Sequence, residues 1–175
     1  IGQLLVWFKR NIEGEKIKYY ALFNDGDNIA DNKKGIGTTG GVHPFEAKDY
    51  KKLKKDLEDV RKMGEGGDDP ENDIEALIKG MAAYRDYQDI VLIADDSEIR
   101  DMSLLKRIRK PVHVILCGTK RGINHQYIKL AVQTKGSIHT TNSSVYIKKL
   151  KEGDEVMLEN FLFIWEDGKL TQYEQ

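Results

Sequence analysis

Short apolar strands alternate with amphipathic helices along most of this chain, and that alternation limits the folds open to it. Ile90 to Ala94 is a continuous apolar run, which is typical of a strand covered by helices on both faces. Val112 to Cys117 and Ser137 to Thr140 predict two more strands, with helices between them. We therefore expect an α/β fold with a doubly wound, mostly parallel sheet, helices on both faces and right-handed crossovers.

The first part of the chain extends this pattern. Helical spacing of apolar residues predicts a helix from Ile1 to Arg10, and Lys16 to Phe23 is a predicted strand. A charged amphipathic helix is predicted around Leu53 to Met63. A further helix is expected to follow, with Asp69 as its N-cap and Pro70 as its first residue.

The last part has a different character. Three short antiparallel strands are expected at the C-terminal end, namely Glu155 to Leu158, Phe161 to Trp165 and Lys169 to Gln172. We interpret residues 1–142 as the main α/β domain and residues 143–175 as a C-terminal β-hairpin appendage of that domain.

Composition narrows the class of protein. The net charge of −1 argues against a general nucleic-acid or anionic-membrane surface, so neither is expected as a partner. No apolar run approaches the roughly 18 residues of a membrane span. Cys117 is the only cysteine, which excludes an internal disulfide. Because it lies at the end of a predicted strand, we expect Cys117 to be a small buried residue rather than a nucleophile. A cytoplasmic protein is the default expectation.

Three acidic clusters follow predicted strands or begin predicted helices: Asn24 to Asp27, Asp68 to Glu71 and Asp95 to Ser97. In an open parallel sheet, ligands bind at the carboxyl ends of the strands. Carboxylate, amide and hydroxyl oxygens suit Mg²⁺, Ca²⁺ or Mn²⁺. The alternative interpretation is structural, because turns and helix caps favour Asp and Asn.

The order of these clusters resembles a known family. The run Gly66-Gly67-Asp68-Asp69-Pro70-Glu71, followed by a strand that ends in Ala94-Asp95, is similar to the bacterial-type von Willebrand factor type A domain. The resemblance covers about residues 1–140. It implies a metal-ion-dependent adhesion site with Asp68 and Asp95 as metal ligands. The expected rim of that site comprises Asn24, Asp25, Asp27, Asp69, Glu71, Asp96 and Ser97.

One element of that family pattern is absent from the sequence. The family carries Asp-x-Ser-x-Ser after its first strand, and no such motif occurs here. We expect that strand to lie upstream of Ile1. In the less favoured alternative, the segment from Phe161 to Trp165 fills its place in the sheet.

Three functions remain open on these grounds. The leading hypothesis is a protein-binding module, not an enzyme, in which a bound Mg²⁺, Ca²⁺ or Mn²⁺ anchors an acidic residue of a protein partner. The second hypothesis is a metal-free scaffold whose site is degenerate. The third is a Mg²⁺-dependent phosphohydrolase that uses the same carboxylates, with Lys120 and Arg121 to stabilise charge.

Overall fold

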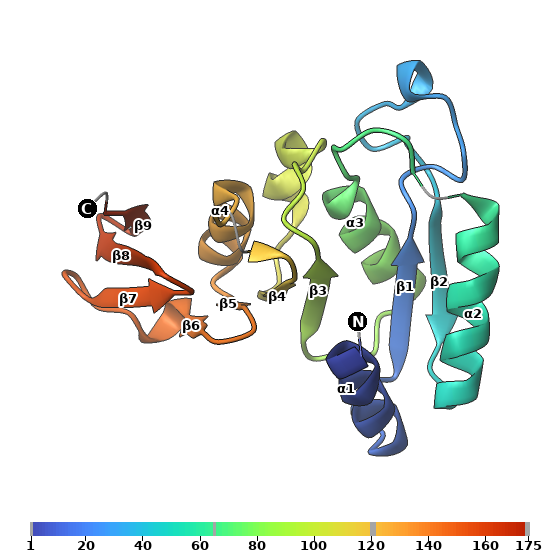
Figure 1. Cartoon of the computed structure of the whole chain (residues 1–175), viewed down its shortest axis with the longest axis horizontal. Coiled ribbons are helices and arrows are strands. Elements are labelled where there is room, and N and C mark those ends of the chain that lie inside the picture. Colours follow the sequence, from blue (N-terminus) through green and yellow to red (C-terminus); the bar gives the residue numbers. More distant parts are fainter. Residues whose placement is uncertain (1, 65, 120–121, 174–175) are drawn as a thin grey trace. The chain divides into compact units, whose positions relative to one another are not determined.

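A computed structural model describes residues 2–64, 66–119 and 122–173 of the chain. The chain divides into two compact units, an N-terminal unit (Ile1–Tyr87) and a C-terminal unit (Gln88–Gln175). Figure 1 shows the elements of each unit in chain order. Lys120 and Arg121, assigned to charge stabilisation in the phosphohydrolase hypothesis, lie outside the described residues.

The N-terminal unit is a small three-layer arrangement. Its elements are α1 (Gly2–Glu13), β1 (Tyr19–Phe23), the 3-10 helix η1 (Asp31–Lys33), β2 (Val42–Glu46), α2 (Tyr50–Met63) and α3 (Asp73–Ala83). Strands β1 and β2 pair antiparallel, and side chains alternate across them because successive residues point to opposite faces. Tyr20 therefore packs with Ile12 of α1 and Leu53 of α2 on one face. Helix α3 contacts both strands, and the Tyr84 ring just beyond it stacks on Tyr19.

Helix α2 forms where the sequence predicts it, with the expected amphipathic spacing and with an N-cap that was not predicted. The Asp49 side chain caps its first turn by accepting a hydrogen bond from the Lys52 N–H at 2.7 Å. Leu53 and Val60 recur at helical spacing and are buried against the rest of the unit. Full burial of one such side chain stabilises the fold by about 1.5–3 kcal/mol. Most of the charged residues of α2 lie away from this buried stripe, although Asp56 is buried with it.

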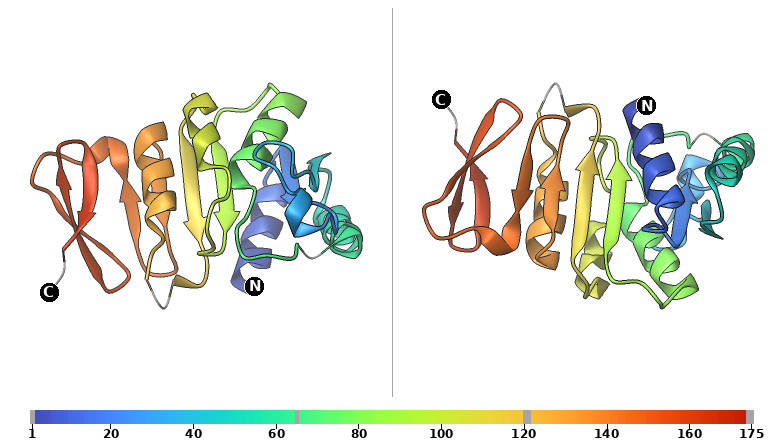
Figure 2. Two further views of the ribbon diagram at one scale, coloured as in Figure 1. Left: turned by 90° about the horizontal axis from the view of Figure 1, so that it is seen from above. Right: turned by 90° about the horizontal axis from the view of Figure 1, so that it is seen from below.

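The C-terminal unit contains two sheets. Its elements are β3 (Ile90–Ala94), the 3-10 helix η2 (Met102–Arg107), β4 (Val112–Leu116), α4 (His125–Thr134), β5 (Ser137–His139), β6 (Ser144–Tyr146), the 3-10 helix η4 (Ile147–Lys149), β7 (Glu155–Leu158), β8 (Phe161–Glu166) and β9 (Lys169–Gln172). Strands β3 to β6 form one sheet in that order, and β7 to β9 form the other. Helix α4 contacts β4 and β5 and lies on one face of their sheet, as the two views of Figure 2 show.

The fold class expected from the sequence is wrong. In the described part of the chain the strands form three small sheets, of two, four and three strands, and most pairs are antiparallel. Parallel pairing there is confined to β3 with β4 and β4 with β5. Apolar periodicity locates strands and helices, but it carries no information on which strand edges meet. The alternation of elements is therefore compatible with several small sheets as well as with one doubly wound sheet.

Several individual elements were predicted correctly, and two strands were missed. Strand β3 and the three C-terminal strands have the expected positions within one residue. Strand β2 has a weak signal because it contains Pro44 and follows a glycine-rich loop, and β6 is only three residues long. The boundary at residues 142 and 143 between domain and appendage stays a prediction.

None of the described helices combines the length and the apolar character that crossing a membrane requires.

Candidate functional site

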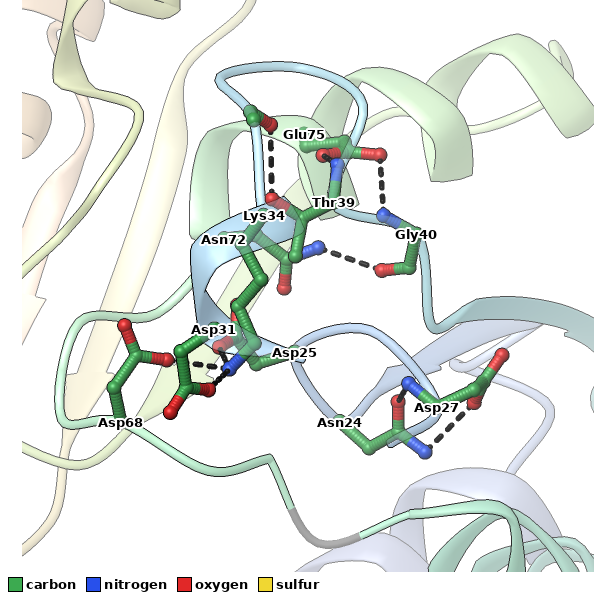
Figure 3. A network of polar contacts seen from close by, with 11 residues as sticks. Asn24, Asp25, Asp27, Asp31, Lys34, Thr39, Gly40, Asp68, Asn72 and Glu75 are labelled. Atoms are coloured by element: carbon green, nitrogen blue, oxygen red, sulfur yellow. Dashed lines mark hydrogen bonds and ion pairs between the residues drawn. The ribbon is translucent and has the colours of Figure 1, made fainter. Parts of the chain in front are cut away.

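Asp68, one of the two expected metal ligands, lies in a cluster of charged side chains in the N-terminal unit. The Lys34 ammonium group is at its centre, 2.6 Å from Asp25 Oδ2 and 3.0 Å from Asp31 Oδ1. Asp68 Oδ1 also accepts a hydrogen bond from Lys34 Nζ. Figure 3 shows the three carboxylates pointing toward this one nitrogen from three segments of the chain. We call these four residues the Lys34 cluster.

The Lys34 cluster reaches into the interior of the unit. The side chains of Lys34 and Asp25 are completely buried, whereas Asp68 keeps 29% and Asp31 55% of its side-chain surface exposed. Burial by itself lowers the pKa of Lys34, but the hydrogen bonds from its ammonium group to Asp25, Asp68 and Asp31 outweigh that effect and raise the pKa. Lys34 is therefore a permanent cation at neutral pH, held where several carboxylates meet.

The turn from Asn24 to Asn28 positions Asp25 within this cluster. Asp25, Gly26, Asp27 and Asn28 all have positive φ, a conformation that Asn, Asp and Gly adopt most easily. The Asn24 side chain closes the turn by accepting a hydrogen bond from the Asp27 N–H at 3.0 Å. The resulting reversal of the chain brings the Asp25 carboxylate inward.

The same turn also binds the C-terminal end of α2. The Asn24 amide donates to the carbonyl oxygens of Val60 and Gly64, and the Asn28 amide donates to that of Met63 at 3.0 Å. The last carbonyl groups of a helix lack partners within the helix itself, so side-chain donors satisfy them here. Asn24, expected at the rim of a metal site, therefore caps a helix.

Asp27, another expected rim residue, also serves the turn. Its Oδ1 accepts a hydrogen bond from the Asn24 amide at 2.8 Å and lies 2.8 Å from His43 Nε2. The first contact lies within the turn, and the second holds the turn against β2, on which His43 lies. The structural interpretation therefore accounts for Asn24 and Asp27, and Asp25 is the member of this segment that faces the lysine.

The glycine-rich loop before β2 is anchored by the start of α3. Both carboxylate oxygens of Glu75 accept backbone N–H groups of the loop, from Thr39 at 2.9 Å and from Gly40 at 3.1 Å. The Asn72 amide donates to the Gly40 carbonyl oxygen at 2.7 Å. Glu75 and Asn72 are almost completely buried, so these bonds fix the loop rather than hold an external ligand.

The acidic run from Asp68 to Glu71 does not begin the helix that was expected there. Helix α3 starts at Asp73, with Asn72 at the N-cap position. The assignment of Asp69 as N-cap and Pro70 as first helical residue is therefore wrong. Asp69 is exposed and Glu71 is half-buried in the segment between α2 and α3. Asp68 is the member of this run whose carboxylate reaches Lys34.

The second expected metal ligand, Asp95, belongs to the C-terminal unit. Its Oδ1 accepts the Ser97 N–H at 3.0 Å, which closes a turn directly after β3. Asp96 Oδ1 accepts the Asn124 N–H at 2.8 Å, and the Asn124 amide donates to the Ser97 carbonyl oxygen at 2.9 Å. Since Asn124 also caps α4, these contacts tie the loop to the start of that helix.

The environment of Asp96 differs from that of Asp95. Burial raises the pKa of Asp96, and the nearby charge of Asp95 adds to the increase, while the hydrogen bond from the Asn124 backbone opposes it. Because Asp68 and Asp95 lie in different units, their expected action as ligands of one ion stays a prediction.

Cys117, expected to be buried, is exposed directly after β4. The strand ends at Leu116, the Cys117 N–H still donates to the Ala94 carbonyl oxygen of β3 at 2.9 Å, and Gly118 follows at a positive φ. The expectation of a buried small residue is therefore wrong, because Val112, Val114 and Leu116 form the buried face of β4 and the alternation places Cys117 on the other face.

The atoms that surround the Lys34 ammonium group in the cluster are carboxylate oxygens, the ligand type that Mg²⁺ and Ca²⁺ prefer. Among the residues that the structure describes, however, no group of three or more His, Cys, Asp or Glu side chains is arranged to hold a metal ion. The ammonium group of Lys34 occupies the point toward which the carboxylates converge. A metal ion could bind there only in exchange for this group.

The residue that organises the cluster has only a weak signal in the sequence. Lys34 follows Lys33 in a loop rich in Asx and glycine, a position typical of a solvated surface lysine. Asp31 lies three residues before it, on η1, at a spacing that allows an ion pair. That spacing gives a possible partner but does not indicate burial, so Lys34 was missed.

Comparisons with known proteins are negative throughout. No protein-family model matches the chain, and neither does any curated protein or any solved structure.

Proposed function

We propose that this chain is a protein-binding module in which a divalent cation at the Lys34 cluster anchors an acidic residue of the partner, the chemistry of a metal-ion-dependent adhesion site. The observation that carries the proposal is the convergence of Asp25, Asp31 and Asp68 on one cationic centre. Asp68 is one of the two residues, with Asp95, that the family resemblance assigns to the metal, and Asp25 is one of the expected rim residues.

Charge balance supports an exchange of cations at this point. Three carboxylates surround one ammonium group, so a divalent ion would match their charge better than a lysine does. Asp68 and Asp31 keep part of their side-chain surface exposed, which gives an ion from solution a route to the cluster. When bound, the cation supplies an electrophilic position for a carboxylate of the partner.

A metal-free scaffold is the second candidate, and a specific observation favours it. The Lys34 side chain is completely buried, and its raised pKa keeps it charged. In this alternative the lysine is a permanent substitute for the metal, and the cluster stabilises the loops that a partner contacts. Partner binding would then be insensitive to chelators.

Thermal unfolding with added metal ions separates the two candidates. After treatment with a chelator, the full chain is titrated with Mg²⁺ and with Mn²⁺ while its Tm is recorded. A ligand that binds only the native state adds about 2.7 kcal/mol of stability at 100 times its Kd. If a cation binds at the Lys34 cluster, the Tm should rise with the concentration of the added metal ion.

Two variants make this result specific. Asp68→Asn removes the proposed ligand, and the metal-dependent rise in Tm should disappear. Asp59→Asn is the matched control, because Asp59 is a partly exposed carboxylate of α2 that pairs with surface lysines. Its metal response should equal that of the unaltered chain. If neither ion changes the Tm of the unaltered chain, cation-dependent binding is contradicted and the metal-free scaffold remains.

A further inference from the structure

Two histidines of the C-terminal unit meet at one buried hydroxyl group. His113 Nδ1 lies 2.7 Å from Ser137 Oγ, and His139 Nε2 lies 2.6 Å from the same oxygen. The other nitrogen of His139 is 2.9 Å from Ser144 Oγ. This line of contacts crosses β4, β5 and β6 on a single face of the sheet. Ser137 is fully buried, and the two histidines are partly buried.

The register of the strands explains why these side chains align. His113 is paired with Ser137 across β4 and β5, and His139 is paired with Ser144 across β5 and β6. Ser137 and His139 are two residues apart on β5, so they point to the same face. Ile138, between them, points to the opposite face, where α4 contacts the strand. The line is thus a product of sheet pairing.

The protons available to this line limit the charge that it can hold. With both histidines neutral, one ring donates to Ser137, and the Ser137 hydroxyl donates to the other ring, so both bonds form. One added proton is also accommodated, because a doubly protonated ring donates from both of its nitrogens. A second added proton makes both rings donors toward Ser137. The hydroxyl proton of Ser137 then has no acceptor within the line, and one oxygen atom separates two cations.

We propose that His113, Ser137 and His139 form a one-proton switch, which accepts a single extra proton intact and releases the pairing of β5 with β6 when it takes up a second. Strand β6 is the element that should respond, since its pairing with β5 is short, with three residue pairs. The repulsion at Ser137 is relieved when the His139 ring moves away from it, and that movement also breaks the contact of His139 with Ser144 across one of those pairs.

The surrounding charged and titratable groups are compatible with this behaviour. The Asp89 carboxylate lies 3.8 Å from His113 Nε2 and is mostly exposed. The Tyr146 ring of β6 lies 5.4 Å from the His139 ring, and Lys149 Nζ lies 4.5 Å from the same tyrosine ring. Glu159 binds the Asn142 amide in the loop that follows β5.

The pKa of His139 agrees in direction with the geometry. Burial lowers that pKa, and the nearby His113 lowers it further. A histidine whose pKa is lower in the folded state than in the unfolded state destabilises the fold once the pH falls below the unfolded value, about 6.5. The unit should therefore lose stability on the acid side of about pH 6.5.

Histidine ring signals in nuclear magnetic resonance spectra of the full chain test the switch between about pH 8 and pH 5. The pKa of His139 is expected to lie below the ordinary histidine value of about 6.5, because burial and the nearby His113 both lower it. His113→Gln should raise the apparent pKa of His139, because it removes the competing charge and keeps a hydrogen-bonding side chain. His43→Gln, in the N-terminal unit, is the matched control and should leave His139 unchanged.

Amide exchange supplies a second measurement that concerns β6 directly. Protection of residues 144–146 relative to β4 should fall in the unaltered chain below about pH 6 and should stay constant in the His139→Gln variant. The proposal is overturned if the apparent pKa of His139 is the same in the unaltered chain and in the His113→Gln variant. Constant protection of β6 down to about pH 5 would overturn it equally.

Discussion

Replacing Lys34 with methionine tests the central feature of the N-terminal unit. Methionine keeps the length and most of the packing of the lysine stem but removes the ammonium group that Asp25, Asp31 and Asp68 share. Asp25 is 1% exposed, so its charge cannot be transferred to solvent without rearrangement of the turn. The substitution therefore leaves a buried carboxylate without the cation that it contacts here.

The magnitude follows from burial. Removing one partner of a buried ion pair typically costs about 3–5 kcal/mol. Asp68 and Asp31 are partly exposed, which places the expected loss near the lower limit, at about 3 kcal/mol at pH 7. Because the pKa of Lys34 is raised, its stabilising effect is complete from neutral pH up to the unfolded lysine value of about 10.4 and is lost as the pH rises further. The cost should shrink below about pH 4, where carboxyl groups become neutral.

Urea unfolding at about pH 7 and pH 4 measures this cost. Lys33→Met is the matched control, since Lys33 is the preceding residue and is exposed. Adding Asp25→Asn to Lys34→Met removes the buried carboxylate charge, so the double variant should recover part of the lost stability. The reasoning is refuted if Lys34→Met is as stable as Lys33→Met at neutral pH, or if its cost does not depend on pH.

Three further substitutions follow from the same structure. Tyr20→Phe removes a 2.6 Å hydrogen bond to Asp56 and should reduce stability by about 1.5 kcal/mol in urea unfolding. Gly136→Ala places a Cβ atom 1.8 Å from the Val112 carbonyl oxygen, so a loss of about 3 kcal/mol or more is expected in thermal unfolding. Because burial raises the pKa of Asp96, Asp96→Asn should raise the Tm at neutral pH, and the gain should vanish as the pH falls through that pKa. The opposite sign for any of these changes would contradict the stated contact.

Much of the local structure is encoded in short stretches of the sequence. The spacing of Leu53 and Val60 suffices to predict α2, and the Asp49 cap, seen in the structure, acts just as locally within the first turn of that helix. The continuous apolar run of β3 and the turn residues around β8 have the same local character. These signals establish where an element lies, and they say little about its neighbours.

The pairing of strands is a different kind of information. Strand β1 pairs antiparallel with β2, although a long glycine-rich loop separates them, and nothing in either segment specifies that partner. The prediction of one doubly wound sheet failed at this step. Which strands pair depends on the total burial and backbone hydrogen bonding of the complete fold, and each strand contributes only part of that total.

The candidate site divides in the same way. Local patterns in the sequence identify Asp68 and Asp25 as residues of interest, because acidic turns and helix starts can be recognised from neighbouring residues. Only the tertiary structure placed the Lys34 ammonium group between them and brought His113 and His139 to one serine. The physical reason is that a charge or a ring acquires its chemical role from desolvation and from partners distant in sequence, and both arise only when the chain is folded.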